Sequence, residues 1–303
     1  MYLKQEQVPD METFDSIREN FSKKIEEKWK VVDPSFLEVD RSIYHYPEFR
    51  KRIFRKIKEE NLVKEKDEEI KDFLFKLVNE NTAKEVVELF KDKPLEELKD
   101  WDDLLEICAR REAAKQVMEL FKDKSLDQLE DWEGVLQRCA SWGAAKEVME
   151  LFKDKSLEEL KDWKNLLGSC ALGGAAKEVM ELFKGKQLDQ LEDWKGVLQR
   201  CASWGVAKQV MELFKDKSLE ELEDWKNLLE SYAYAGAAKE VMELFKGKQL
   251  DQLENWKSVL QRCARGGAAK EVMELFKDKS LEELEDWKNL LESYAYAGAA
   301  KEV

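Results

Sequence analysis

The chain has 303 residues, of which 43% are hydrophobic and 39% are charged, and its formal net charge is −14. Residues 1–79 hold 17 Lys/Arg and 18 Asp/Glu, so nearly all of the negative charge lies in residues 80–303. An acidic array repels phosphates, which argues against nucleic acid as the main partner. No run approaches the roughly 18 apolar residues of a membrane span, and the N-terminal MYLKQEQVPDMETF lacks the apolar core of a secretory signal. We therefore expect an intracellular, cytoplasmic protein in a reducing compartment.

Residues 1–69 are predicted to form an N-terminal helical cap or adapter. Residues 11–31 have the pattern of an amphipathic helix, which Asp33 and Pro34 would end. The stretch EFRKRIFRKIKEE predicts a second helix with a candidate basic patch, made of Arg50, Arg52, Arg55 and Lys56. A basic amphipathic helix can bind an acidic partner, a membrane surface or nucleic acid. It can equally cap the acidic repeats and neutralise them, which is the interpretation we favour.

Residues 70–303 form a tandem repeat with a period of 31 residues. Seven tryptophans mark equivalent positions, namely Trp101, Trp132, Trp163, Trp194, Trp225, Trp256 and Trp287. Such a period indicates stacked supersecondary units, each of which buries its apolar face against its neighbours. A degenerate unit with Ile70 at the tryptophan position precedes the series. The last unit stops at Val303 within a helix, which predicts a missing C-terminal portion.

The unit around Trp225 predicts two helices. Ser218 and Glu221 form an S-x-x-E capping box, and the apolar spacing that follows predicts a first helix of about 18 residues. A break at Asp224 is the alternative. Gly236 would stop this helix in a left-handed conformation, and the second helix would end at Asp or Gly. The inward residues expected on the second helix are Ala238, Val241, Met242 and Phe245. We interpret the tryptophans as a buried spine rather than an aromatic cage, because each should bury about 150–250 Å².

Cysteine and histidine give no support to a metal site, a cofactor or catalysis. Five cysteines stand seven residues after a repeat tryptophan, namely Cys108, Cys139, Cys170, Cys201 and Cys263. Tyr232 and Tyr294 replace cysteine at the same phase, so this phase is predicted to be a packing position. No CxxC pair is present, and His45 is the only histidine. We expect buried thiols, no metal, no cofactor and no enzymatic activity.

Within the unit around Trp225, five residues stand at offsets of 0, 3, 7, 11 and 20, namely Trp225, Leu228, Tyr232, Gly236 and Phe245. This pattern resembles the tetratricopeptide signature, and the stretch LLESYAYAGAAKEVMELF is similar to the pentatricopeptide pattern. The resemblance covers about residues 70–303. It implies an all-α, right-handed α-solenoid of stacked helix-turn-helix repeats, with the first helix of each unit lining the concave face. Tetratricopeptide likeness implies protein or peptide binding, and pentatricopeptide likeness implies single-stranded RNA.

The units differ mainly at the fifth and ninth residues after each tryptophan. These positions are four apart and share one helix face. Candidate partner-binding residues at or next to them are Arg110, Gln137, Trp142, Gln199, Trp204, Tyr234, Gln261, Arg265 and Tyr296. Aromatic and arginine side chains are common at binding hot spots, whereas drift on a solvated face is the alternative. The predicted function is a protein- or peptide-binding scaffold. RNA binding and end-to-end assembly of solenoids are the alternatives.

Overall fold

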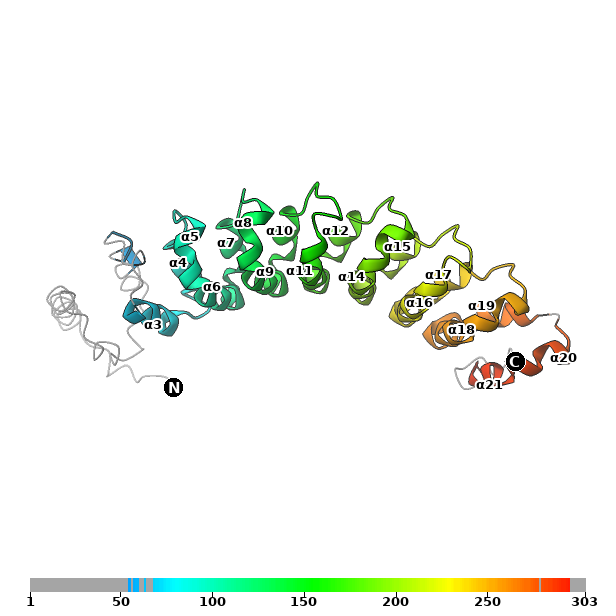
Figure 1. Cartoon of the computed structure of the whole chain (residues 1–303). Helices are drawn as coiled ribbons and strands as arrows, with labels where there is room; N and C mark the ends of the chain where they lie inside the picture. Colours follow the sequence, from blue (N-terminus) through cyan, green and yellow to red (C-terminus); the bar gives the residue numbers. More distant parts are fainter. Residues whose placement is uncertain (1–53, 56, 60–62, 64–67, 278, 295–303) are drawn as a thin grey trace, which may run out of the picture. The chain divides into compact units, whose positions relative to one another are not determined.

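The computed structural model describes residues 54–55, 57–59, 63, 68–277 and 279–294 (Figure 1). Every regular element in these ranges is helical, which confirms the all-α prediction. The N-terminal helix predicted at residues 11–31 and the chain end at Val303 lie outside the described residues. The same holds for four residues singled out above, namely His45, Arg50, Arg52 and Lys56.

The chain divides into two compact units, Met1–Leu104 and Leu105–Val303. The first contains α3 (Glu68–Leu77), α4 (Ala83–Glu88), α5 (Leu95–Leu98), η4 (Lys99–Trp101) and the start of α6 (Asp102–Cys108). Thr82 joins α3 to α4, because its buried hydroxyl donates a hydrogen bond of 2.6 Å to the Leu77 carbonyl and accepts one of 2.9 Å from the Asn79 amide. The end of α3 is thereby satisfied without a glycine.

The second unit repeats one helical pair. After each tryptophan comes a helix that we call helix A: α6, α9 (Glu133–Cys139), α11 (Lys164–Cys170), α14 (Lys195–Cys201), α16 (Lys226–Tyr232), α18 (Lys257–Cys263) and α21 (Lys288–Tyr294). Its partner, helix B, is α7 (Ala114–Glu119), α10 (Ala145–Glu150), α12 (Ala176–Glu181), α15 (Ala207–Met211), α17 (Ala238–Glu243) or α19 (Ala269–Met273). Figure 1 shows helices A and helices B of this unit in two adjacent rows. The chain is therefore a helical repeat protein.

The prediction of one continuous helix of about 18 residues was wrong. Glu223–Trp225 (η12) is a 3-10 turn, in which the Trp225 amide donates to the Leu222 carbonyl at 2.9 Å, and α16 begins only after it. The alternative, a break at Asp224, is closer to the structure. The capping box is confirmed, since the Ser218 amide donates to the Glu221 carboxylate at 2.9 Å and the Glu221 amide to the Ser218 hydroxyl at 3.2 Å.

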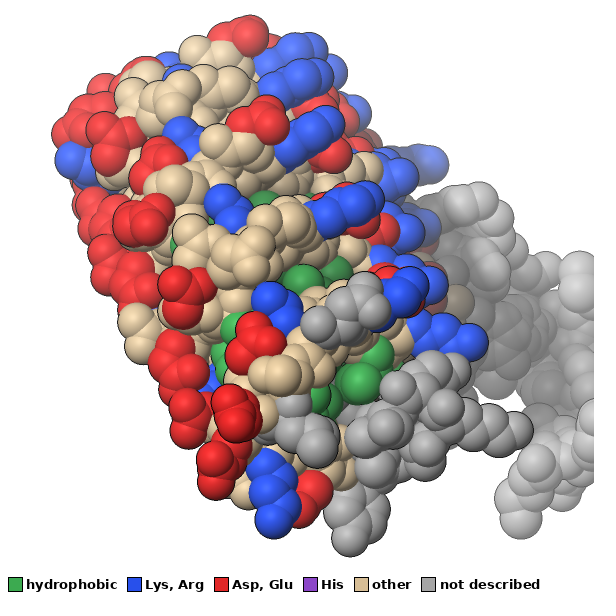
Figure 2. Space-filling model, turned by 90° about the vertical axis from the view of Figure 1, so that its right-hand side faces the viewer, with side chains coloured by type: hydrophobic (Ala, Val, Ile, Leu, Met, Phe, Trp, Pro, Cys, Tyr) green, Lys and Arg blue, Asp and Glu red, His purple; other side chains and the backbone are tan. Residues whose placement is uncertain are grey.

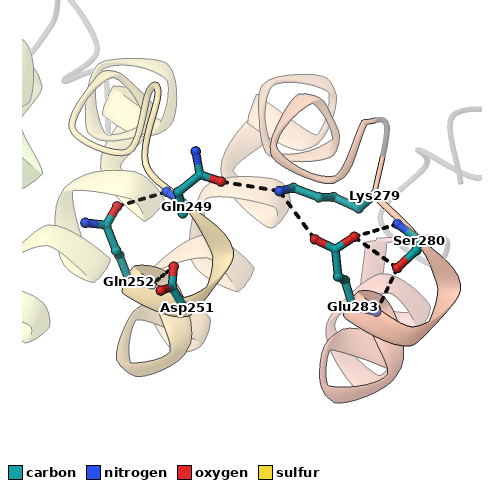
Figure 3. A network of polar contacts seen from close by, with 6 residues as sticks. All are labelled: Gln249, Asp251, Gln252, Lys279, Ser280 and Glu283. Carbon is teal, nitrogen blue, oxygen red and sulfur yellow. Dashed lines mark hydrogen bonds and ion pairs between the residues drawn. The ribbon is translucent and has the colours of Figure 1, made fainter.

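Short helical elements also precede helix A in other units. They are α8 (Leu126–Leu129), η6 (Glu130–Trp132), η8 (Lys161–Trp163), α13 (Leu188–Leu191), η10 (Glu192–Trp194), η14 (Leu250–Trp256), α20 (Leu281–Leu284) and η17 (Glu285–Trp287), whereas η16 (Glu274–Phe276) directly follows α19. Figure 3 shows a link between two neighbouring repeats near the start of these short elements. Lys279 donates to the Gln249 side chain at 3.4 Å and pairs with Glu283 at 3.6 Å.

In each repeat, a turn of five residues joins helix A to helix B. These turns are η5 (Ala109–Ala113), η7 (Ala140–Ala144), η9 (Ala171–Ala175), η11 (Ala202–Val206), η13 (Ala233–Ala237) and η15 (Ala264–Ala268). The predicted left-handed stop is confirmed, with φ of 97° at Gly236. Glu112 adopts φ of 68° at the same phase in η5, a conformation that favours glycine. Helix B is followed by a second left-handed residue, for example Asp216 with φ of 66° or Gly247 with φ of 74°.

The tryptophans form the predicted spine. All seven are only 1–6% exposed, and each ring packs on the phenylalanine that follows the preceding helix B, or α4 in the case of Trp101, with centroids 5.1–5.6 Å apart. The residue after one tryptophan also reaches the next tryptophan, as where Lys195 lies 4.7 Å from the Trp225 ring. The inward residues predicted for helix B, Ala238, Val241, Met242 and Phe245, are all buried.

Ion pairs link neighbouring repeats along the exposed side of helices B, which we call the helix B face. Lys146 lies 2.9 Å from Glu178, and Lys239 lies 2.8 Å from Glu271. The hydrogen bond from Lys146 is the main cause that lowers the pKa of Glu178, and Lys239 acts in the same way on Glu271. Gln209 interrupts the series opposite Lys177. This face therefore serves the contact between repeats.

At the α20 and α21 end of Figure 1, a hollow of about 480 Å³ is lined by Met273, Phe276, Leu284 and Leu291, with lysine and glutamate at its rim. Figure 2 shows green hydrophobic side chains on this side of the molecule, next to grey atoms that are not described. Acidic side chains line one edge of the same view, and basic side chains line the other. None of the described helices combines the length and the apolarity that a membrane crossing requires.

Candidate functional site

Large exposed apolar side chains gather on the turns between helices A and B. Within the described residues they are Trp142 in η7, Leu172 in η9 and Tyr234 in η13, with 54%, 40% and 79% of their surface exposed. The other apolar phases of these repeats face the core. Because these exposed side chains stand on equivalent turns of different repeats, the turns are the candidate site.

The turns form a continuous row, which we call the turn strip and define as η5, η7, η9, η11, η13 and η15. Each turn packs on the next. Gly173 allows a close approach, because a Cβ atom at this position would lie 2.0 Å from the Ala140 carbonyl oxygen of η7. Gly266 does the same at η15, where a Cβ would lie 2.2 Å from the Ala233 oxygen. The strip is therefore fixed by backbone packing.

Polar groups beside the strip are paired between repeats at a spacing of 32 residues. The Arg138 Nε donates to Glu106 Oε2 at 3.1 Å, and Arg262 lies 3.7 Å from Glu230. In the unit between them, the Gln199 amide donates to the Ser231 hydroxyl at 3.2 Å. The fifth residue after one tryptophan thus faces the sixth residue after the next, along the row of helices A.

Four of the remaining sequence candidates lie on helices A or on the turn strip, namely Arg110, Gln137, Gln261 and Arg265. Arg110 is exposed and lies 3.7 Å from Glu106, and Gln137 donates to Glu133 in its own helix at 2.8 Å. Gln261 is half-buried on α18, and Arg265 is exposed in η15. Trp204 lies in η11, but its side chain is outside the description, as is the whole of Tyr296. Arg55 is exposed and belongs to the first unit.

The candidate set did not include Leu172 and Gly168, which the structure places with the others. Their repeat differs from the others at both variable positions. Glycine stands at the fifth position, where the others have Glu or Gln, and leucine stands at the ninth, where the others have Arg, Ser or Tyr. Comparison of the fifth and ninth phases could therefore have found them. The sequence pattern could not show that Arg200 of the following unit lies across Gly168, where a Cβ would be 2.8 Å from Arg200 Cδ.

The chemistry of this side is that of contact and charge. All five cysteines are buried, as predicted. Burial raises the pKa of Cys108, Cys170, Cys201 and Cys263 to about 12, so their thiols stay protonated at neutral pH. In the described part of the chain, His, Cys, Asp and Glu side chains form no group of three or more that could hold a metal ion.

No protein-family model matches this chain, and no curated protein matches its sequence. The assignment to a class of helical repeat protein therefore rests on the fold and on the repeat pattern described above.

Proposed function

We propose that the chain is a tetratricopeptide-like scaffold that binds a protein or peptide along its helices A and the turn strip. In this proposal the repeats form a right-handed solenoid with helices A on the concave side. One observation carries it: Trp142, Leu172 and Tyr234, the large exposed apolar side chains of the described residues, all lie on turns of this strip. Single exposed apolar side chains are common on protein surfaces, so it is their recurrence on equivalent turns that favours a partner.

The polar surroundings favour a polypeptide over RNA. Glu106 and Glu230 stand along helices A and hold Arg138 and Arg262 in ion pairs, so these arginines are not free for phosphates. Stacking on Trp142 or Tyr234 would be open to bases, but phosphate neutralisation supplies most of the affinity of an RNA-binding protein. A peptide can use the same aromatic side chains without a dense positive field.

The experiment is selection of random peptides displayed on phage against the immobilised full chain. Binding constants of the selected peptides are then measured by fluorescence anisotropy. We expect Tyr234→Ser and Leu172→Ser each to weaken binding by about tenfold or more, the scale of an interface hot spot. Serine occupies the same phase at Ser141 and Ser203, so both variants should keep the fold. Lys146→Gln on the helix B face is the matched control and should leave binding unchanged.

Three outcomes would contradict the proposal. One is the absence of any selected peptide, and another is equal affinity in the wild type and both serine variants. The third is salt-dependent binding of a labelled oligouridylate, lost in Tyr234→Ser, which would assign the strip to RNA. Light scattering of the free chain checks assembly, since growth to large particles would favour solenoids that stack end to end.

A further inference from the structure

Helix A carries one arginine in every second repeat, at Arg138, Arg200 and Arg262. The first and third of these pair with a glutamate of the preceding repeat, Glu106 and Glu230. The equivalent position before Arg200 is Gly168. Among the described residues Arg200 makes no ion pair, although its side chain is exposed at the same place on the surface.

The geometry at Gly168 explains where the Arg200 side chain goes. A Cβ on Gly168 would lie 2.8 Å from Arg200 Cδ and Nη1 and 3.1 Å from Cζ. The arginine therefore lies flat across the glycine, in the space that a glutamate side chain would enter. Its guanidinium stays over helix A of the preceding repeat, with exposed donors and no internal carboxylate to receive them.

Exposed apolar side chains lie in the repeat that contains Gly168 and in the repeat before it. Leu172 follows Gly168 by four residues, which places both on one face of the same unit, and it is 40% exposed. Trp142 stands on the adjoining turn and is 54% exposed. The turns η7 and η9 pack on one another, so Trp142 and Leu172 stand on adjacent turns of the strip.

We propose that the patch of Trp142, Gly168, Leu172 and Arg200 binds a peptide segment in which an Asp or Glu side chain is flanked by apolar residues. The ligand carboxylate takes the position that Glu106 and Glu230 hold toward their arginines in the equivalent repeats, and the apolar residues cover Leu172 and Trp142. Charge complementarity favours this ligand. Arg138 and Arg262 each have a glutamate partner within the protein, whereas Arg200 has a glycine at the equivalent position. The inference rests on the proposed function and deepens it.

The test uses the peptides selected on the full chain. We expect Asp or Glu between apolar residues in most of them. Arg200→Gln should weaken binding about tenfold, the scale of one charge-assisted hydrogen bond. Replacing the peptide carboxylate with its amide should cost the same factor, and the two changes together should cost no more than either one. Equal additive losses would show that the two groups do not meet and would overturn the inference.

Substitutions at Gly168 give a second and independent test. Gly168→Glu restores the internal carboxylate seen before Arg138 and Arg262, so it should pair with Arg200 and lower peptide affinity about tenfold. Gly168→Gln has nearly the same size without the charge and is the matched control. A loss of affinity that is equal in both variants would show that bulk, not charge, closes the site, and would overturn the inference. Circular dichroism checks that both variants are folded.

The outcomes separate this inference from the proposed function. Peptides that depend on Tyr234 and Leu172 but show neither acidic residues nor sensitivity to Arg200→Gln would leave the scaffold intact and remove the carboxylate site. Absence of any bound peptide would remove both. The Glu230→Gly variant should create a second unpaired arginine at Arg262 and so raise the number of peptides bound per chain.

Discussion

The helix B face and the turn strip are built from the same 31-residue copies, yet they differ in what repeats. On the helix B face, ion pairs such as Lys146–Glu178 and Lys239–Glu271 recur with nearly the same length. On the strip, one phase is occupied by Leu172, Ser203 and Tyr234 in successive turns. Residues that join repeats on the helix B face are largely kept from repeat to repeat, with Gln209 as the exception, whereas the exposed position on the strip varies. Four substitutions can break or sharpen this contrast.

The largest effect is expected at the spine. Trp194→Ala should lower the free energy of unfolding by about 3–5 kcal/mol, because the indole is 2% exposed and packs on Phe183 at 5.5 Å. Leu172→Ser on the strip should change it by less than about 0.5 kcal/mol. Urea unfolding followed by circular dichroism measures both. Similar losses in the two variants would contradict the division between spine and strip.

A smaller loss is expected where the strip itself is fixed. Gly173→Ala should destabilise the chain by about 1–3 kcal/mol, since the new Cβ would meet the Ala140 oxygen of the preceding turn, η7. Gly196→Ala is the matched control in α14, where a Cβ has nothing within 4 Å and should instead stabilise by about 0.5–1 kcal/mol. Equal effects of the two alanines on the urea midpoint would mean that the turns do not pack closely.

A gain in stability is expected from a substitution at Tyr232, which stands in the core where other repeats have cysteine. The Tyr232 hydroxyl is buried without a hydrogen-bond partner, and burial raises the pKa of Tyr232 well above its usual range. Tyr232→Phe removes the unsatisfied group and should raise the free energy of unfolding by about 1 kcal/mol. A decrease on the same measurement would show that the hydroxyl has a partner. Tyr234→Phe, at an exposed position, serves as the neutral comparison.

The smallest effect on stability is expected from the pH dependence of the Lys146–Glu178 ion pair. Lys146 lowers the pKa of Glu178 below its ordinary value of 4.5, so this pair stabilises the fold above that pH. The contribution is lost as the pH falls through the lowered pKa, because the glutamate is then protonated in both states. The difference in urea midpoint between wild type and Glu178→Gln should therefore be present at pH 7 and shrink toward pH 3. A constant difference would exclude the ion pair as its source.

Much of the fold followed from the sequence because each feature has a local cause. Tryptophan spacing predicted the spine, Ser218 and Glu221 predicted their capping box, and Gly236 predicted a left-handed stop. The continuous first helix was wrong because apolar periodicity persists across the 3-10 turn before Trp225 and hides the break. The variable phases pointed to Tyr234, but the meeting of Arg200 with Gly168 depends on stacking between units, which no single repeat encodes.

The buried cysteines have a further use. Cys139, Cys170 and Cys201 stand one to a repeat in the spine, each shielded from water and held as a thiol. A thiol reagent can reach each of them only when its own repeat opens. Alkylation followed by mass spectrometry would therefore time the opening of individual repeats along the array without added probes. Slowing of the reaction around Cys170 and Cys201 by a bound peptide would map its footprint from inside the core.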